Sequence, residues 1–142
     1  MAKNKQIQMR LRSVREVRFS MTSGKLGFDD RGDELQIGFK NDLFPDIDRE
    51  VFTIHFGVQY SINGEILLES VYAFEFDVKD LAEFVSTDGH GKWTVRGLMP
   101  HMVSVAVGTM RGILAVRTVG TDLNKYPIPI MDPIQLCENL AK

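Results

Sequence analysis

Alternating apolar and polar residues predict a long β-hairpin in the middle of the chain. Over residues 51–78 the two kinds of residue alternate on either side of Asn63-Gly64. Successive side chains of a strand point to opposite faces of a sheet, so this alternation indicates half-buried strands. Asn-Gly favours the tight turn between them, because both central residues of a type I′ turn need a positive φ. One face of the hairpin is rich in aromatic residues and must be covered by other parts of the chain.

Two more strands are predicted before the hairpin. Residues 7–21 alternate, although Ser13 and Arg15 interrupt the apolar positions. Residues 35–39 alternate as well. Pro45 is expected to end that second strand, because proline cannot donate a hydrogen bond to a sheet ladder. The turn-forming residues between the two strands predict a long crossover loop.

The chain after the hairpin is harder to assign. Residues 79–85 predict a short helix, 86–92 a loop, and 93–99 a short strand or the approach to a helix. Residues 101–119 fit two patterns. Valines alternate with small residues, which favours a strand, and valine and glycine are poor helix formers. Small or polar residues also recur at helical spacing, which would give a helix that is apolar on its other sides and buried between two surfaces. Periodicity alone leaves both structures open.

The C-terminal part is predicted to form a rigid extended segment, a strap, followed by a helix. Residues 126–133 contain three prolines, which restrict the backbone. Asp132 is a favourable N-cap and Pro133 occupies the favoured first helical position. The last helix has one apolar side, formed by Ile134, Leu136, Cys137 and Leu140.

Composition places the chain among ordinary globular proteins. A length of 142 residues, with 44% hydrophobic and 25% charged residues, predicts one domain over residues 1–142. A single cysteine, Cys137, excludes an internal disulfide and fits a reducing compartment. The N-terminal residues show no signal-peptide pattern, and we expect that no apolar stretch is long enough to span a bilayer. We therefore expect a cytoplasmic protein.

Charge is distributed unevenly along the chain. The first 18 residues hold six of the 17 basic residues and one of the 19 acidic residues. A basic arm of this kind can bind nucleic acid. No aromatic platform or recognition motif accompanies it, so we interpret the arm as a solvated strand face and expect no nucleic-acid partner.

Few residues of the sequence are candidates for catalysis or for binding a metal or a cofactor. The three histidines lie at no metal-ligand spacing from a cysteine or carboxylate. Residues 89–92 resemble a phosphate loop only superficially, because Trp93 stands where serine or threonine should follow the lysine. The acidic residues at 29–34 lack the EF-hand spacing. We therefore expect no catalytic residues, no metal and no cofactor.

The order of motifs resembles the SecB family of protein-export chaperones. The pattern comprises Pro100 before the long helix, Arg111-Gly112, Gly120-Thr121, Tyr126-Pro127, and Pro133 before a short terminal helix that carries Leu136. This resemblance implies an α+β fold with a four-stranded antiparallel sheet, packed by a long helix at 101–119 and a short C-terminal helix at 133–141. It also implies a molecular chaperone that binds non-native polypeptides and performs no chemistry.

The resemblance leaves alternatives for partners. The family docks on the export motor SecA partly through an acidic sheet surface, whereas this chain has a net charge of only −2. We therefore expect client binding more than SecA coupling, and a client outside export, such as a labile antitoxin, is one alternative. A non-catalytic adaptor or structural assembly protein on the same fold is another.

Two sets of residues are predicted to make the functional contacts. Apolar residues in otherwise polar or extended segments are the candidates for client binding: Leu26, Phe28, Leu43, Phe44, Tyr126, Ile128 and Ile130.

A helix at 101–119 would cover the hairpin with one side and still expose Met102, Val103, Met110 and Leu114. That surface, together with the small or polar residues that recur at helical spacing along the same helix, predicts a homotetramer built as a dimer of dimers. The expected interface residues are Met102, Ser104, Gly108, Arg111, Ala115 and Thr118.

Overall fold

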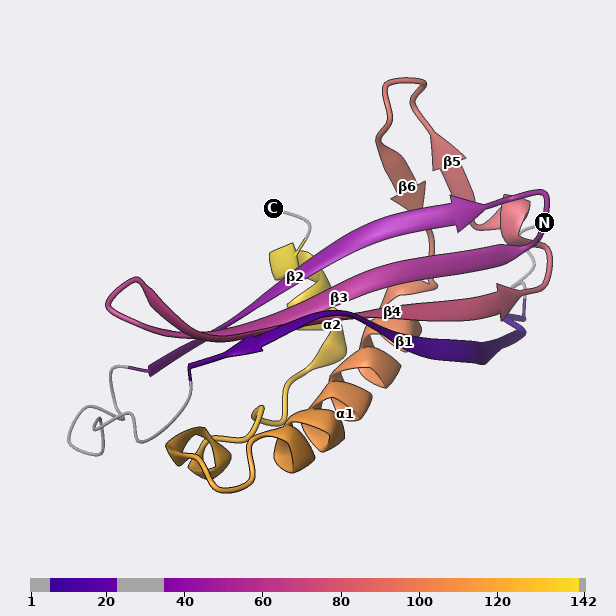
Figure 1. The fold of residues 1–142 in the computed structure, drawn as a ribbon. Helices are drawn as coiled ribbons and strands as arrows, with labels where there is room; N and C mark the ends of the chain where they lie inside the picture. The colour runs from indigo at the N-terminus through magenta and orange to yellow at the C-terminus, as the bar shows by residue number, and fades with distance from the viewer. Residues whose placement is uncertain (1–5, 23–34, 141–142) are drawn as a thin grey trace.

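The computed structural model describes residues 6–22 and 35–140, and its centre is one antiparallel sheet (Figure 1). The sheet has the strand order β1-β4-β3-β2. Its strands are β1 (Met9–Met21), β2 (Leu35–Asp46), β3 (Val51–Ile62) and β4 (Glu65–Val78). β1 and β2 are therefore the two edge strands, and the predicted four-stranded antiparallel sheet is confirmed.

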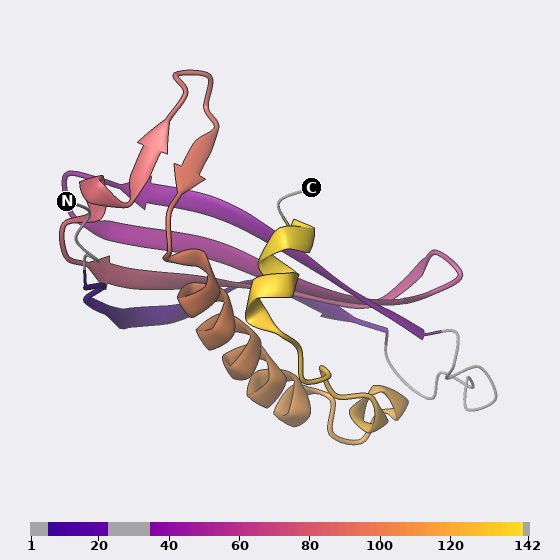
Figure 2. The same cartoon turned by 180° about the vertical axis from the view of Figure 1, so that it is seen from behind.

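The helical elements and a small second hairpin follow the sheet in sequence. They are η2 (Leu81–Glu83), β5 (Val85–Thr87), β6 (Trp93–Val95), α1 (Met99–Arg117), η3 (Asp122–Lys125) and α2 (Pro133–Leu140). Both α-helices lie on the same face of the sheet, and β5 and β6 project away from it (Figure 2). We call the helix-covered face the inner face and the other the outer face.

The β3–β4 hairpin forms as its alternation predicts. Asn63 and Gly64 both have positive φ, at 51° and 82°. Phe52 pairs with Phe76, and Phe56 with Tyr72, and all four side chains are buried. These aromatic pairs form the floor of the core on which the helices pack.

β1 carries two irregularities that explain its interrupted pattern. Its register with β4 shifts between Leu11 and Ser13 and again between Glu16 and Arg18. Each bulge inserts one residue and moves the following side chains to the other face. Val14 and Glu16, opposite Phe74 and Tyr72, therefore face inward with Leu11, although their numbers have the other parity.

β2 is longer than predicted because Pro45 does not end it. The strand continues to Asp46, and Pro45 is paired with Phe52 in an unbroken register. The order of the sheet gives the reason. β2 is an edge strand, and proline is tolerated there because no further strand needs its missing N–H group.

α1 resolves the ambiguity at residues 101–119 in favour of a helix, with Met99 and Arg117 as its ends. Its inner side, which includes Met102, Val103 and Met110, is fully buried, so tertiary packing outweighs the low helix propensity of valine. By length and composition α1 could cross a membrane, with a mean hydropathy of 1.3. The expectation that no stretch is long enough was therefore wrong. Because one side of α1 packs in the core, we assign its apolar character to packing.

The region between the sheet and α1 differs from the prediction. Only Leu81–Glu83 are helical, as one 3₁₀ turn, where a helix over 79–85 was expected. Val85–Thr87 instead pair with Trp93–Val95. The C-terminal helix is confirmed, and its cap forms as predicted: the backbone N–H of Ile134 donates to Oδ1 of Asp132 at 3.0 Å.

Candidate polypeptide-binding surfaces

Most exposed large apolar side chains gather on β1, α1 and the residues that follow them. Between 38% and 72% of each of these side chains is accessible. We call this set the β1–α1 surface, and it consists of Leu11, Val14, Val17, Val105, Val116, Val119 and Ile134. One end of it is hollowed: a concavity of about 610 Å³ is lined by residues of β1, α1 and the start of α2. Leu11, Val105 and Ile134 line this concavity, and exposed apolar side chains gathered around one hollow are typical of an interaction site.

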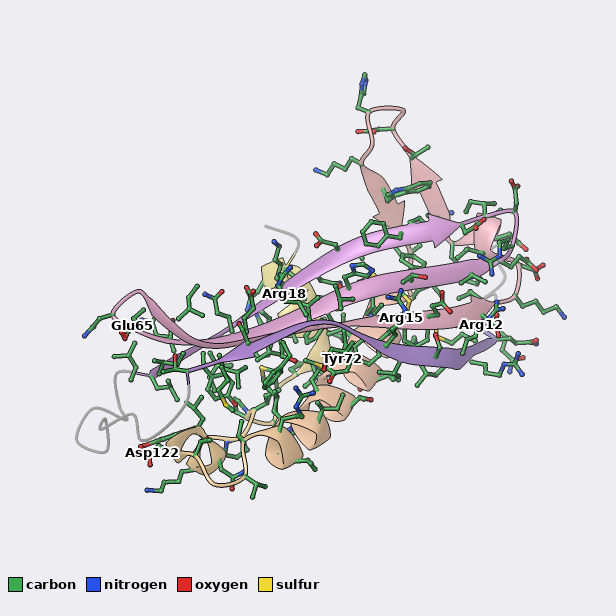
Figure 3. The ribbon with its side chains drawn as sticks, in the orientation of Figure 1. Arg12, Arg15, Arg18, Glu65, Tyr72 and Asp122 are labelled. Atoms are coloured by element: carbon green, nitrogen blue, oxygen red, sulfur yellow. The ribbon has the colours of Figure 1, made fainter. Side chains whose placement is uncertain are left out.

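A polar contact fixes the end of α1 against β1. Nη1 of Arg117 lies 2.7 Å from Oε1 of Glu16, and the hydroxyl of Tyr72 donates to the same oxygen at 3.0 Å. The Arg117 guanidinium also lies 3.9 Å from the centre of the Phe19 ring, a cation–π distance. The hydrogen bond from Arg117, then that from Tyr72, lowers the pKa of Glu16 below its usual value. Figure 3 shows Tyr72 between the sheet and α1.

The predicted interface residues divide between the surface of α1 and the core. Ser104, Gly108 and Ala115 are exposed, and Arg111 is half-buried. Met102 and Thr118 are buried inside the chain, so their side chains are not accessible to a second copy in this structure. Leu114, like Val103 and Met110 above, also lies on the buried side. The large apolar residues that α1 exposes are Val105 and Val116, and not Met102, Val103, Met110 or Leu114.

Three hydrogen bonds hold the strap of residues 126–131 beside α1. The Arg111 side chain donates from Nε to the carbonyl oxygen of Ile128 and from Nη2 to that of Pro129, both at 2.8 Å. The hydroxyl of Tyr60 donates to the carbonyl oxygen of Tyr126 at 2.6 Å. Burial of the phenol raises the pKa of Tyr60 to about 12.

The strap alternates between the core and solvent. Ile128 is 2% exposed and belongs to the hydrophobic core, whereas Ile130 is 94% exposed. Tyr126 is half-buried against that core. Of the predicted client residues on the strap, Ile130 is therefore the accessible one and Ile128 is a packing residue.

The remaining predicted client residues do not join the strap in a single groove. Leu43 and Phe44 are neighbours on β2 and therefore point to opposite faces of the sheet. Phe44 lies on the outer face, half exposed, with its ring 4.6 Å from that of His55. Leu26 and Phe28 lie outside the described residues.

The basic residues of β1 form ion pairs on the outer face. Arg10 and Arg12 contact Asp77 at 2.8 and 3.4 Å, and Arg18 contacts Glu69 at 2.8 Å. The hydrogen bond from Arg10 lowers the pKa of Asp77. Figure 3 shows Arg12, Arg15 and Arg18 spaced along this side of the sheet. Two acidic residues of β4, Asp77 and Glu69, are therefore paired with arginines of the neighbouring strand.

Sequence reasoning missed most of the β1–α1 surface. Val14, Val17 and Ile134 were assigned to strand or helix but not to a contact surface. The one signal in the sequence was the broken alternation of β1, which leaves apolar residues at both parities. No group of three or more histidine, cysteine, aspartate or glutamate side chains within residues 6–22 and 35–140 is placed to hold a metal ion.

Comparisons with known proteins support the fold. No protein-family model and no curated protein matches the chain. One similar solved structure is the SecB-like chaperone Rv1957 of Mycobacterium tuberculosis, in complex with a ChAD peptide from the antitoxin HigA1 (Rv1956). The two share 11% sequence identity with a TM-score of 0.51, over 87% of this chain and 89% of that one. A protein of unknown function from Streptococcus agalactiae is 12% identical, with a TM-score of 0.36 over 89% of this chain and 99% of that one. The likeness to Rv1957 shows that the chain has a distant SecB-like fold.

Proposed function

We propose that this protein is a molecular chaperone that binds non-native polypeptide and performs no chemistry. The observation that carries the proposal is the exposed apolar surface of a chain whose fold is that of a SecB-like chaperone. Burial of apolar area is non-directional and contributes about 25 cal/mol per Å², so such a surface can hold many different sequences. The solved neighbour with a bound antitoxin peptide supports a polypeptide client in particular.

A second copy of the chain is proposed to cover part of this surface. α1 packs on the sheet with one side, while Val105 and Val116 on its other side are exposed. Gly108 lies between them along the helix, and no atom lies within 4 Å of the place that a Cβ would take there, so another backbone can approach closely. Closed two-fold symmetry is the commonest way to bury such a patch, and repeating it gives the homotetramer, as a dimer of dimers.

A dedicated client is favoured over the export motor as the main partner. In the SecB family an acidic sheet surface contributes to SecA docking, but here Asp77 and Glu69 are paired with arginines of β1. The paired carboxylates offer less free negative charge to a basic partner. We therefore place service to one labile polypeptide, of the kind that an antitoxin represents, ahead of a role in preprotein translocation.

Suppression of aggregation tests the proposed function. A chemically unfolded protein is diluted into buffer with increasing amounts of this chain, and light scattering follows aggregation. We expect scattering to fall in proportion to added chain, and we expect no binding to the same protein in its folded state. Undiminished scattering at a molar excess would contradict the chaperone function and favour the adaptor alternative.

A further inference from the structure

β1 is more exposed than the other long strands of the sheet. Nine of its thirteen residues are exposed, and none of the residues Met9–Met21 is buried. On β3, by contrast, none of the residues Val51–Ile62 is exposed. The apolar contacts of β1 with the core come from its two ends, where Met9, Phe19 and Met21 are partly buried. Burial of apolar side chains therefore contributes little to holding the middle of β1 in place.

The backbone ladder between β1 and β4 is divided into short runs. Within Met9–Met21, Arg12 and Val17 lack a partner on β4, so β1 pairs in three runs of three or four residues each. A bulge disrupts the ladder locally and leaves its extra residue unpaired. β2, the other edge strand, pairs with β3 over twelve residues in one register. Of the two edges, β1 therefore has the weaker attachment to the sheet.

On the outer face, polar side chains at the protein surface tie β1 to β4. Arg10 and Arg18 make the ion pairs with β4 described above, and their side chains are 79% and 54% exposed. The hydroxyl of Ser13 donates to Oε1 of Glu75 at 2.9 Å. Ion pairs as exposed as these contribute little each, and salt screens them. The side-chain attachment of β1 on this face is therefore weak and should depend on ionic strength.

The rest of the fold has a core that does not require β1. β4 pairs with β3 on its other side over twelve residues, and the aromatic pairs of these two strands support the helices. On the inner face, Arg117 at the end of α1 contacts Glu16 and Phe19 of β1. Separation of β1 would therefore leave the β3–β4 hairpin packed against α1, while it uncovers the edge of β4 and releases Arg117.

We propose that β1 opens as a separate unit while the other three strands and the helices stay folded, and that assembly of the chain holds it closed. Elements with few buried apolar contacts and many exposed hydrogen bonds are the ones that open locally. The side chains that β1 leaves exposed, Leu11, Val14 and Val17, belong to the surface that a second copy is proposed to cover. A partner that binds only the closed strand stabilises it by mass action. This second part rests on the assembly proposed above, and it makes β1 a latch that uncovers the edge of β4 in a separate protomer.

Amide hydrogen exchange at single residues tests the opening. β2 is the matched control, because it is the other edge strand and has a similar length. The comparison uses the amides of β1 that donate to β4 and the amides of β2 that donate to β3, so that both sets are hydrogen-bonded. At low protein concentration we expect the β1 amides to exchange about tenfold or more faster than those of β2 and β3. Equal rates in β1 and β2 would overturn the separate opening of β1.

Two variants test whether the ion pairs of the outer face hold the strand. Arg18→Gln removes the pair with Glu69, and we expect exchange in β1 to become about two- to fivefold faster. Arg49→Gln is the matched control, because it removes the pair with Asp46 at the β2–β3 turn and should leave exchange in β1 unchanged. Circular dichroism establishes that both variants are folded. The same exchange rates in the two variants would overturn the role of the Arg18 pair in closing β1.

Exchange at a low and a high protein concentration tests the coupling to assembly, while light scattering reports the mass at each. We expect the mass to rise with concentration and exchange in β1 to slow about tenfold, with little change in β2. A chain that assembles without slowing exchange in β1 would overturn the coupling and leave the assembly standing. A monomeric mass at both concentrations would overturn the assembly and with it the closing of β1 by a second copy. The aggregation assay described above measures the chaperone function separately from either result.

Discussion

The two edge strands of the sheet have similar lengths but opposite characters. β1 is bulged at two places and carries four arginines, whereas β2 keeps one register and carries a single basic residue, Lys40. Bulges and charges are devices by which proteins keep an edge from pairing with other chains. β1 therefore offers its side chains to a partner, and β2 offers its backbone. The same sheet can therefore make side-chain contacts at one edge, β1, and backbone contacts at the other, β2.

The elements that cover the inner face of the sheet also differ between the two edges. On the β1 side, α1 is fixed by the contact of Arg117 with Glu16 and leaves valines exposed. On the β2 side, the strap and α2 complete the cover, and Arg111 and Tyr60 hold the strap by its carbonyl groups. The β1 side of the inner face is thus suited to a second copy, while its β2 side is covered by the strap and α2 of the same chain.

The largest expected effect comes from blocking the β1 side. Gly108→Glu places a bulky charge on the exposed stripe of α1, where no atom beyond the adjacent residues and the neighbouring helix backbone lies within 4 Å of the new Cβ. We expect a folded protein whose assembly separates into smaller units. Light scattering at micromolar concentration measures the mass. A monomeric mass for the unmodified protein would contradict the assembly, and an unchanged oligomer in the variant would move the interface away from Gly108.

A substantial loss of stability is expected from releasing the strap on the β2 side. Arg111→Ala removes two hydrogen bonds from a charged group to backbone carbonyls, and each bond of this kind contributes about 1.5–3 kcal/mol. Because the bond to Pro129 is exposed to solvent and contributes less, we expect the free energy of unfolding to fall by about 2–4 kcal/mol in urea titrations at one fixed protein concentration. Arg15→Ala is the control, because the Arg15 side chain makes no ion pair or hydrogen bond with the described residues. Similar losses in both variants would mean that the strap does not depend on Arg111.

The smallest effect is expected at the contact between Glu16 and Arg117, and it should depend on pH. The pKa of Glu16 is lower in the folded protein than its ordinary value of 4.5. Its stabilising contribution is therefore complete above that value and is lost as the pH falls through the folded pKa. Glu16→Gln should lower the thermal midpoint modestly near pH 7, and the difference from the unmodified protein should shrink toward about pH 3.

A matched variant isolates the pH effect to this contact. Glu65→Gln changes an exposed glutamate at the β3–β4 turn and should leave the thermal midpoint nearly unchanged at both pH values. A difference for Glu16→Gln that persists undiminished at low pH would show that loss of charge is not the cause.

The sequence predicted the parts of the fold that rest on local pattern. The β3–β4 hairpin follows from its alternation and from Asn63-Gly64, and the start of α2 follows from Asp132 and Pro133. α1 required the family resemblance, because valine and glycine weaken its local helix signal and only packing against the sheet decides it. β5 was missed, since the three residues Val85–Thr87 are too short to show a period, whereas its partner Trp93–Val95 lies in the segment for which a short strand was one alternative.

The candidate site was less predictable because it depends on tertiary placement. Nothing local distinguishes Ile128, which is buried, from Ile130, which is exposed two residues later. Pro45 was misjudged because the position of β2 at an edge is a property of the whole sheet. The bulges of β1 were visible only as a broken alternation at Ser13 and Arg15, which gives no direction for the side chains that follow.

The sheet order has a consequence for synthesis on the ribosome. β1 is made first, yet its partner is β4, and even the nearest pair, Met21 with Leu68, is separated in sequence by both β2 and β3. A strand that awaits so distant a partner forms its contacts late, because long-range pairing must first overcome the entropy of closing the loop. We expect the β3–β4 hairpin to form first and the nascent N-terminal strand to stay unpaired until β4 has left the exit tunnel. During that interval the newly made chain itself resembles the unfolded polypeptides that it is proposed to bind.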